Sequence, residues 1–334
     1  STPSNSSAAS DVYKRQYIVL IDKTKPIVVA LGGNAISKGS GETVAEQFAR
    51  ARVSLAPLVE LARSGYRIAI THGNGPQVGN ALRRVELSQK QVIPLPLYLC
   101  GATTQGEIGY IIANTLTNLF EENKVQRKVG TIVTQVVVNR EDPAFQNPTK
   151  FIGRFYTKEE ARELAHRSGW TVREDSGRGW RRVVASPWPE EIVEVEAIRN
   201  LLEKDVIAVC TGGGGIPVYR DERGRVHGVD AVIDKDRASA VLGLALGAET
   251  LIILTGVEKV ATNYGSLYQR DWDMMSVGGA KEFLEKGEFP PGSMGPKIES
   301  AIFFVENGGK QVIITSIDRV KEGLENDGGT RIVP

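Results

Sequence analysis

The chain has 334 residues, with 41 Lys plus Arg against 40 Asp plus Glu, which leaves a formal net charge of +1. A charge this small gives no overall field for nucleic acid or for an anionic membrane surface. Hydrophobic residues make up 41% and charged residues 24%, an ordinary balance that can bury a core in one large α/β domain or two modest ones.

Cysteine content and hydropathy exclude further classes. Cys100 and Cys210 form no metal or redox motif, and we expect both to be small buried side chains. Two cysteines make no disulfide framework, which fits a reducing compartment and a cytoplasmic location. The sequence contains no run of about 18 consecutive apolar residues, so we expect no transmembrane helix. The Ser-rich start lacks the features of a signal peptide, so we expect residues 1–24 to be a disordered extension or a remnant foreign to the natural protein.

Strands and helices alternate along the rest of the chain. Apolar runs predict strands at 27–31, 66–71, 206–210, 251–254 and 311–315, with a β-rich segment at 129–138 and a hairpin around 221–224. Periodic segments predict helices at 43–63 (interrupted near Pro57), 101–123, 190–203, 235–246 and 294–306. This alternation predicts an α/β fold with an open, mostly parallel sheet and helices on both faces.

Residues 140–189 break the alternation. Proline pairs such as Asp142-Pro143 and Asn147-Pro148, and the turn Gly177-Arg178-Gly179, punctuate this stretch. One short helix is expected at 157–167. We interpret the stretch as a subdomain that is inserted into a single domain, residues 25–334, and projects from its sheet.

Three glycine-rich turns follow predicted strands: Gly32-Gly33, Gly73-Asn74-Gly75 and Gly212–Gly215. Ligands of open α/β sheets bind at the carboxyl ends of the strands, where glycine lets backbone N–H groups approach an anion. One such turn is weak support because glycine also makes tight turns for structural reasons. Three together favour a polyphosphate site, although no P-loop, dinucleotide fingerprint or protein-kinase motif set is present.

Lysines beside these turns suggest the same chemistry. Lys235 and Lys297 stand at predicted helix starts, where a cation is unfavourable unless an anion binds there. Lys150 lies in the insertion. Asp234 and Asp236 flank Lys235, either as an ordinary N-cap pair or with Asp236 fixing the lysines in place.

Other chemistries find little support. His72 precedes the second glycine turn, and we expect a structural or surface role for it rather than a catalytic one. No spacing of His, Cys and carboxylates predicts a metal site in the protein. Neither a nucleophile elbow nor a Ser-His-Asp arrangement is present.

Taken together, the motifs resemble the carbamate kinases of the amino acid kinase family. The matching segments run in family order over about residues 25–334. They are 28–35, 72–80, 104–110, 133–136, 142–145, 147–150, 177–181, 212–217, 232–236, 254–257 and 291–297. Within the superfamily, Asn34-Ala35 and the insertion ending near Trp180-Arg181 separate this pattern from acetylglutamate, aspartate and uridylate kinases.

The resemblance implies an αβα sandwich with a protruding subdomain, a homodimer, and reversible phosphoryl transfer between ATP with Mg²⁺ and carbamate, which gives ADP and carbamoyl phosphate. ATP synthesis in arginine catabolism is the role it implies. Residues 25–222 would bind carbamate and 223–334 the nucleotide. The implied catalytic residues are Lys150, Lys235, Asp236 and Lys297; the implied acceptor-binding residues are Gly32, Gly33, Asn34, Gly73, Asn74 and Gly75; and the implied nucleotide-binding residues are Gly213, Gly214, Thr255, Gly256, Tyr264 and Met294.

The chain departs from the family pattern beside Lys150. The family usually has proline at the positions of Phe151 and Arg154, so the rigidity with which Lys150 is presented is in question. Three alternatives stay open: another amino acid kinase such as acetylglutamate kinase, a non-catalytic nucleotide sensor of the same fold, and a Rossmann oxidoreductase.

Overall fold

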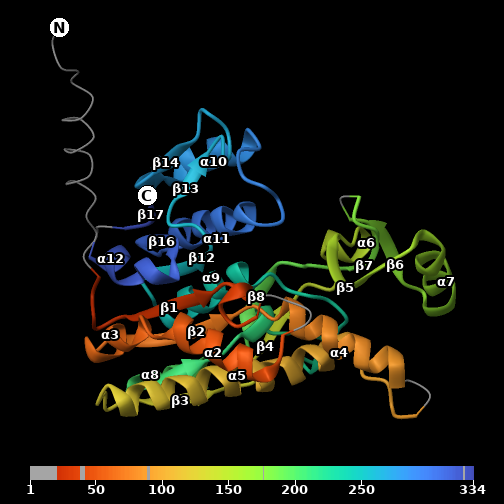
Figure 1. Ribbon diagram of the computed structural model, residues 1–334, viewed down its shortest axis with the longest axis horizontal. Coiled ribbons are helices and arrows are strands. Elements are labelled where there is room, and N and C mark those ends of the chain that lie inside the picture. The colour runs from red at the N-terminus through yellow and green to blue at the C-terminus, as the bar shows by residue number, and fades with distance from the viewer. Residues whose placement is uncertain (1–20, 38–41, 89–90, 176, 326–327) are drawn as a thin grey trace, which may run out of the picture.

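The computed structural model describes residues 21–37, 42–88, 91–175, 177–325 and 328–334. An eight-stranded sheet runs through its centre (Figure 1). Its strands are β1 (Pro26–Leu31), β2 (Arg67–His72), β3 (Lys128–Thr131), β9 (Val206–Val209), β12 (Thr250–Thr255), β15 (Met274–Ser276), β16 (Gln311–Ser316) and β17 (Thr330–Val333). They lie in the order β15-β17-β16-β12-β1-β2-β9-β3. All neighbours are parallel except β16 and β17, which confirms the mostly parallel sheet.

Helices cover both faces of this sheet. One face carries α2 (Val44–Leu55), α3 (Leu58–Arg63), α5 (Leu97–Glu122) and α12 (Val320–Leu324), and the other carries α8 (Val195–Glu203), α9 (Lys235–Leu246), α10 (Val277–Glu285) and α11 (Met294–Glu306). Alternate residues of β1 serve the two cores: Val29 packs with α5 and Val28 with α9 and α11. A strand buried on both faces has to be apolar throughout, as β1 is. The predicted αβα sandwich is confirmed.

A second, four-stranded sheet was not expected. It has the order β11-β10-β4-β8, with β4 at Gln135–Val138, β8 at Pro189–Ile192, β10 at Ile216–Arg220 and β11 at Val226–Gly228. The prediction of helix from residue 190 was therefore wrong for 190–192. Ile192 is buried opposite Val136 on the antiparallel neighbour, and this pairing outweighs the helix preference of Glu190 and Glu191.

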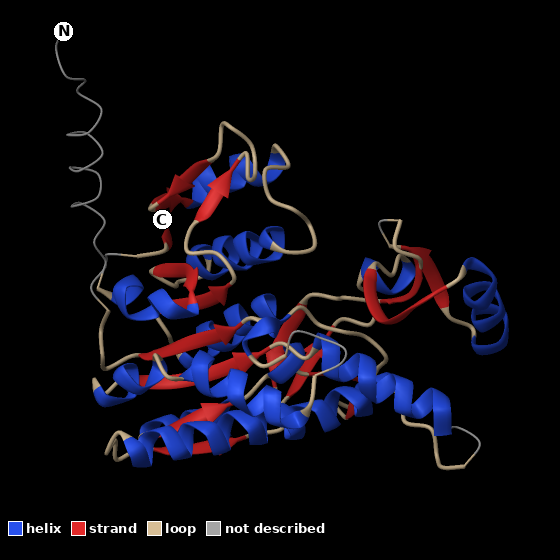
Figure 2. Cartoon of the chain, in the orientation of Figure 1, coloured by secondary structure: helices blue, strands red, loops and turns tan. Residues whose placement is uncertain are grey.

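The inserted segment forms a sheet of its own. Strands β5 (Lys150–Tyr156), β7 (Trp180–Val184) and β6 (Thr171–Glu174) pair in the order β5-β7-β6, with α6 (Pro143–Gln146) and α7 (Lys158–Ser168) beside them. Figure 2 shows this inserted subdomain standing apart from the sandwich. Its β5 rests on α4 (Gly75–Ser88), where glycines meet: a Cβ atom on Gly79 would lie 3.8 Å from the Cα atom of Gly153.

The remaining predictions concern the ends and the cysteines. Residues 1–20 of the expected extension lie outside the described residues, whereas Ile21 packs against the core and the Lys23 ammonium lies 5.1 Å from the ring centre of Tyr66. Cys100 and Cys210 are buried free thiols, as expected. Among the described residues, no helix combines the length and the apolar character needed to cross a membrane. The division at residues 222 and 223 stays a prediction.

Candidate active site

The three glycine turns meet at the carboxyl ends of neighbouring strands. β1 leads into Gly32 and Gly33, β2 into Gly73, and β9 into Gly212–Gly214, and these strands are adjacent in the order β1-β2-β9. The turns touch: a Cβ atom on Gly73 would lie 3.2 Å from the Cα atom of Gly33, and one on Gly213 would overlap the Asn74 amide. Gly213 also has a φ of 65°, which disfavours any other residue. Packing alone therefore requires glycine at Gly213 and leaves little room for a side chain at Gly73, whereas a Cβ atom on Gly33 or Gly75 would meet nothing within 4 Å.

Two lysines share one buried carboxylate beside these turns. Asp236 lies in the first turn of α9 and is 2% exposed. It accepts hydrogen bonds from the ammonium groups of Lys235 and of Lys297, the latter at 2.9 Å. Lys297 comes from the first turn of α11, which packs against α9. The structure thus brings together two lysines that lie on different helices.

Asp234 has a separate function at the start of α9. Its Oδ1 accepts a hydrogen bond of 2.9 Å from the backbone N–H of Asp236, which makes it the helix N-cap. Its Oδ2 lies 3.1 Å from the ammonium of Lys150 in the inserted subdomain. Both interpretations of the aspartate pair therefore hold: Asp234 caps the helix and Asp236 fixes the lysines.

Burial and charge oppose each other in the lysine pair. Burial lowers the pKa of Lys235, the carboxylate of Asp236 opposes this effect, and the charge of Lys297 adds to it. Burial alone would raise the pKa of Asp236, but the charges of Lys235 and Lys297 outweigh burial, so that the pKa is lowered. Asp236 is accordingly a carboxylate at neutral pH.

A cavity of about 380 Å³ lies over these groups, and we call it the acceptor cavity after the role that the family resemblance predicts for its glycine turns. Its walls include the glycine turns at Gly33, Gly73, Gly75 and Gly213, four cationic side chains (Lys150, Arg181, Lys235 and Lys297) and two carboxylates (Asp234 and Asp236). Four cations against two anions leave the cavity positive. Its volume suits a small ligand, and its charge selects an anion.

A second cavity of about 420 Å³ adjoins the first, and we call it the nucleotide cavity after the role that the family resemblance predicts for Thr255 and Gly256 in its lining. It lies at the carboxyl ends of β1, β12 and β16 and is lined by Gly32, Thr255, Gly256 and Asp318, among others. Lys235 and Lys297 line both cavities. Two anionic ligands, one in each cavity, would therefore meet at these two ammonium groups.

Most of the expected site residues line one of the two cavities. The residues that line the acceptor cavity are Gly33, Gly73, Asn74, Gly75, Lys150, Lys235, Asp236, Lys297 and Gly213. Those that line the nucleotide cavity are Gly32, Thr255 and Gly256. Gly213, expected to contact the nucleotide, thus lies with the acceptor turns. The side chain of Asn34 lies outside the described residues.

Three expected residues line neither cavity. Gly214 lies behind its turn, against the backbone carbonyl of Ile233. Tyr264 is 65% exposed in the loop after β13 (Val260–Thr262), and Met294 begins α11. Their nucleotide-binding role stays a prediction.

Sequence reasoning missed Arg181. This residue of β7 lines the acceptor cavity, and its guanidinium is held by Asp175 at 3.0 Å. The available signal was the Gly177–Arg181 run in the insertion, which served only as a family marker. Phe151 also lines the cavity, with its ring centre 5.7 Å from the Arg181 guanidinium carbon.

His72 has a structural environment, as expected. Its side chain is 1% exposed, and Nδ1 hydrogen-bonds the carbonyl of Gly73 at 3.1 Å. Burial lowers its pKa to about 4, so the ring is neutral at neutral pH. Its Nε2 packs so closely on Gly212 that a Cβ atom there would overlap it. Within the described part of the chain, no group of three His, Cys, Asp or Glu side chains could hold a metal ion.

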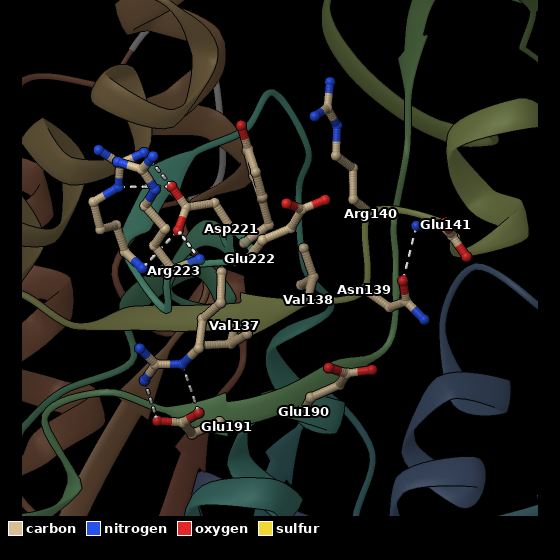
Figure 3. A pocket seen from close by; sticks show the side chains of 13 residues that line it. Val137, Val138, Asn139, Arg140, Glu141, Glu190, Glu191, Asp221, Glu222 and Arg223 are labelled. Carbon is tan, nitrogen blue, oxygen red and sulfur yellow. Dashed lines mark hydrogen bonds and ion pairs between the residues drawn. The ribbon is translucent and has the colours of Figure 1, made fainter.

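Another groove of about 680 Å³ lies at the root of the inserted subdomain (Figure 3). Several of its charges pair with one another. Arg220 forms two hydrogen bonds with Glu191, while Asp221 accepts hydrogen bonds from Arg225 and His227. The hydrogen bonds from His227 and Arg225 lower the pKa of Asp221 to about 2. With these charges neutralised internally, the groove is a weaker candidate than the lysine-lined cavities.

Comparison with known proteins gives the same grouping. A model of the amino acid kinase family matches residues 25–316. The carbamate kinase of Thermococcus kodakarensis is 46% identical over 313 residues, which cover 92% of this chain and 99% of that protein. The carbamate kinase of Trichomonas vaginalis is 43% identical over 311 residues, with the same coverage. The structure of carbamate kinase from Giardia lamblia bound to AMP-PNP superposes with a TM-score of 0.86 at 40% identity, covering 92% of this chain and 98% of the other. The chain belongs to the amino acid kinase family and, within it, groups with the carbamate kinases.

Proposed function

We propose that this protein is a carbamate kinase, which transfers a phosphoryl group reversibly between ATP and carbamate and so forms ADP and carbamoyl phosphate. One observation carries the proposal: Lys235 and Lys297 are held on the buried Asp236 where the acceptor and nucleotide cavities meet. The relatives named carbamate kinase and the Giardia structure with AMP-PNP, an ATP analogue, support the same reaction.

The site meets the electrostatic demand of this reaction. Carbamate is an anion, so its oxygen attacks the γ-phosphorus without a general base, and the neutral, buried His72 is not needed as one. Two anions must approach in line, and negative charge then moves to the leaving oxygen of ADP. Phosphoryl transfer of this kind depends on positioning and on cationic stabilisation. Lys235 and Lys297 supply that stabilisation.

The acceptor is held by the glycine turns and capped by the insertion. Gly33 and Gly73 line the acceptor cavity, where backbone N–H groups of such glycine turns would suit an anionic oxygen. Lys150 reaches the same cavity from the inserted subdomain, with 39% of its side chain exposed. It therefore caps the site from a separate, more solvent-exposed element.

Further parts of the proposal concern the metal, the assembly and the physiological role. Mg²⁺ enters with ATP or ADP, because Asp234 and Asp236 are already paired with ammonium groups. A homodimer is supported by apolar side chains on α5, where Leu99 is 41% and Tyr110 61% exposed. The physiological role would be ATP formation from carbamoyl phosphate, as in arginine catabolism, in the cytoplasm.

The test is ATP formation from ADP and carbamoyl phosphate while Mg²⁺ is varied, with ATP measured by chromatography of quenched samples, because a coupling kinase would itself need Mg²⁺. A forward panel of carbamate, acetylglutamate, aspartate and UMP identifies the acceptor. Turnover with carbamate and carbamoyl phosphate alone is the expected result. Turnover with acetylglutamate instead would assign the chain to another amino acid kinase, and ADP binding without turnover would indicate a sensor.

A further inference from the structure

Arg181 is a second cation that the inserted subdomain presents to the acceptor cavity. It lies on β7, the central strand of the subdomain's sheet, and its side chain is 21% exposed. It lines both the acceptor cavity and an outer cavity of about 770 Å³ that continues from it between the subdomain and the start of α11. Lys150 and Phe151 line the same two cavities. A ligand that enters between the subdomain and the sandwich therefore passes Arg181.

The guanidinium is held in place from within the subdomain. Nη1 donates to Oδ2 of Asp175 at 3.0 Å, and the Asp175 side chain is 6% exposed. The guanidinium carbon lies 5.7 Å from the ring centre of Phe151 and 5.1 Å from that of Phe155. The hydrogen bond from Arg181 is the largest factor that lowers the pKa of Asp175, so this carboxylate stays charged. Rings and carboxylate together fix the direction of the side chain.

The same arrangement leaves donors available for a ligand. Among the described residues, Nη1 bonds Asp175 and no hydrogen bond uses Nη2. Lys150 differs in the position of its partner, because its ammonium pairs with Asp234 of the sandwich and not with a residue of the subdomain. Arg181 keeps its partner however the subdomain lies relative to the sandwich, whereas Lys150 does not. Arg181, and not Lys150, is therefore the cation whose direction is already fixed within the subdomain.

We propose that Arg181 binds the phosphate group of carbamoyl phosphate through its terminal nitrogens, and that Asp175 is a positioning residue that aims it. The planar fork of a guanidinium matches two phosphate oxygens, which a single ammonium group cannot do. Arg181 thereby favours the phosphorylated substrate, carbamoyl phosphate, over carbamate in the acceptor cavity. The proposal deepens the carbamate kinase function and rests on it.

Steady-state kinetics in the direction of ATP formation test this assignment. Arg181→Gln should raise the KM for carbamoyl phosphate roughly tenfold or more, the usual effect of losing a charge-assisted hydrogen bond, while the KM for ADP is unchanged. Arg181→Lys, which keeps the charge but loses the fork, should give a smaller rise in the same constant. Asp175→Asn should shift this KM in the same direction.

Arg167→Gln is the matched control. Arg167 is an exposed cation on α7 of the same subdomain, and it lines neither the acceptor cavity nor the outer cavity. Its kinetic constants should equal those of the wild type.

Titration calorimetry with phosphonoacetamide, a non-reactive analogue with CH₂ in place of the bridging oxygen, measures binding without turnover. Its affinity should fall in Arg181→Gln by the factor seen in KM.

Each outcome is decisive. An unchanged KM for carbamoyl phosphate in Arg181→Gln, or an equal rise in the KM for ADP, overturns the assignment. If Arg181→Gln fails to fold, Arg181→Lys provides the test. An unchanged affinity of Arg181→Lys for phosphonoacetamide would also overturn the assignment. If the wild type forms ATP and Arg181→Gln has the same KM for carbamoyl phosphate, only this inference is refuted. Absence of ATP formation by the wild type refutes the proposed function itself.

Discussion

The ammonium of Lys150 lies 3.1 Å from Oδ2 of Asp234, which joins the inserted subdomain to the N-cap of α9. Lys150 is also the most exposed of the three site lysines, with 39% of its side chain accessible against 12% for Lys235 and 14% for Lys297. An exposed ammonium interacts more weakly with a ligand because water screens it. Lys150 should therefore contribute to ligand binding more than to the chemical step.

Lys150→Ala should raise the KM for carbamoyl phosphate and reduce kcat less than removal of either buried lysine does. Lys158→Ala is the control, because Lys158 belongs to the same subdomain but lines neither cavity. Steady-state kinetics with carbamoyl phosphate as the varied substrate give both constants. If KM and kcat both match the wild type, the capping role is wrong.

Lys235→Ala and Lys297→Ala should each reduce kcat roughly a hundredfold or more, because each removes one preorganised cation from the transferring phosphoryl group. The fold should survive, since Asp236 keeps the other lysine as its partner. Lys310→Ala is the control, because Lys310 pairs with Glu249 and lines neither cavity. Circular dichroism verifies folding. Near wild-type turnover in both variants would falsify the assignment.

Asp236→Asn should destabilise the protein, unlike either lysine variant. It would leave two largely buried ammonium groups facing each other without a carboxylate, and loss of one partner of a buried ion pair costs about 3–5 kcal/mol. Urea denaturation measures the free energy of unfolding. The double variant Asp236→Asn with Lys297→Met should recover part of the loss. A midpoint equal to that of the wild type would show that the network does not contribute to stability.

His72 should make folding stability depend on pH. Burial lowers its pKa from 6.5 to about 4, so between these values the unfolded state binds the proton more tightly. Stability is highest above pH 6.5 and falls as the pH drops towards 4, by about 2 kcal/mol between pH 7 and pH 5 from this residue. His72→Asn, compared by urea denaturation at both pH values, should show a smaller decrease. Equal decreases in the two proteins would argue against the shift.

Removal of Mg²⁺ should abolish turnover without unfolding the protein. In the proposed mechanism the metal arrives with the nucleotide, and Asp236 is already neutralised by two lysines. EDTA should therefore stop ATP formation, added Mg²⁺ should restore it, and the Tm of the nucleotide-free protein should stay the same. A large drop in Tm with EDTA would instead reveal a structural metal.

The amino-acid sequence predicted the elements of the fold whose signals are local. Helices α9 and α11 begin and end at the expected residues because a capping or glycine signal and an apolar face mark them. β1 was recognisable because a strand buried on both faces has to be apolar throughout. The glycine turns and the two lysines at helix starts stood out for similar reasons, since each is unusual in its own local context. Local context left the role of Asp236 open, and the family resemblance singled it out.

Tertiary structure alone decided which of these residues meet. Lys297 bonds Asp236 across 61 positions because α9 and α11 pack side by side on one face of the sheet. Residues 190–192 form a strand because β4 pairs with them, although their own side chains suit a helix. Arg181 enters the acceptor cavity because the insertion folds back over the carboxyl ends of the strands. Local preferences are encoded within a few neighbouring residues, whereas contacts between distant segments depend on the order in which strands pair, which no single segment specifies.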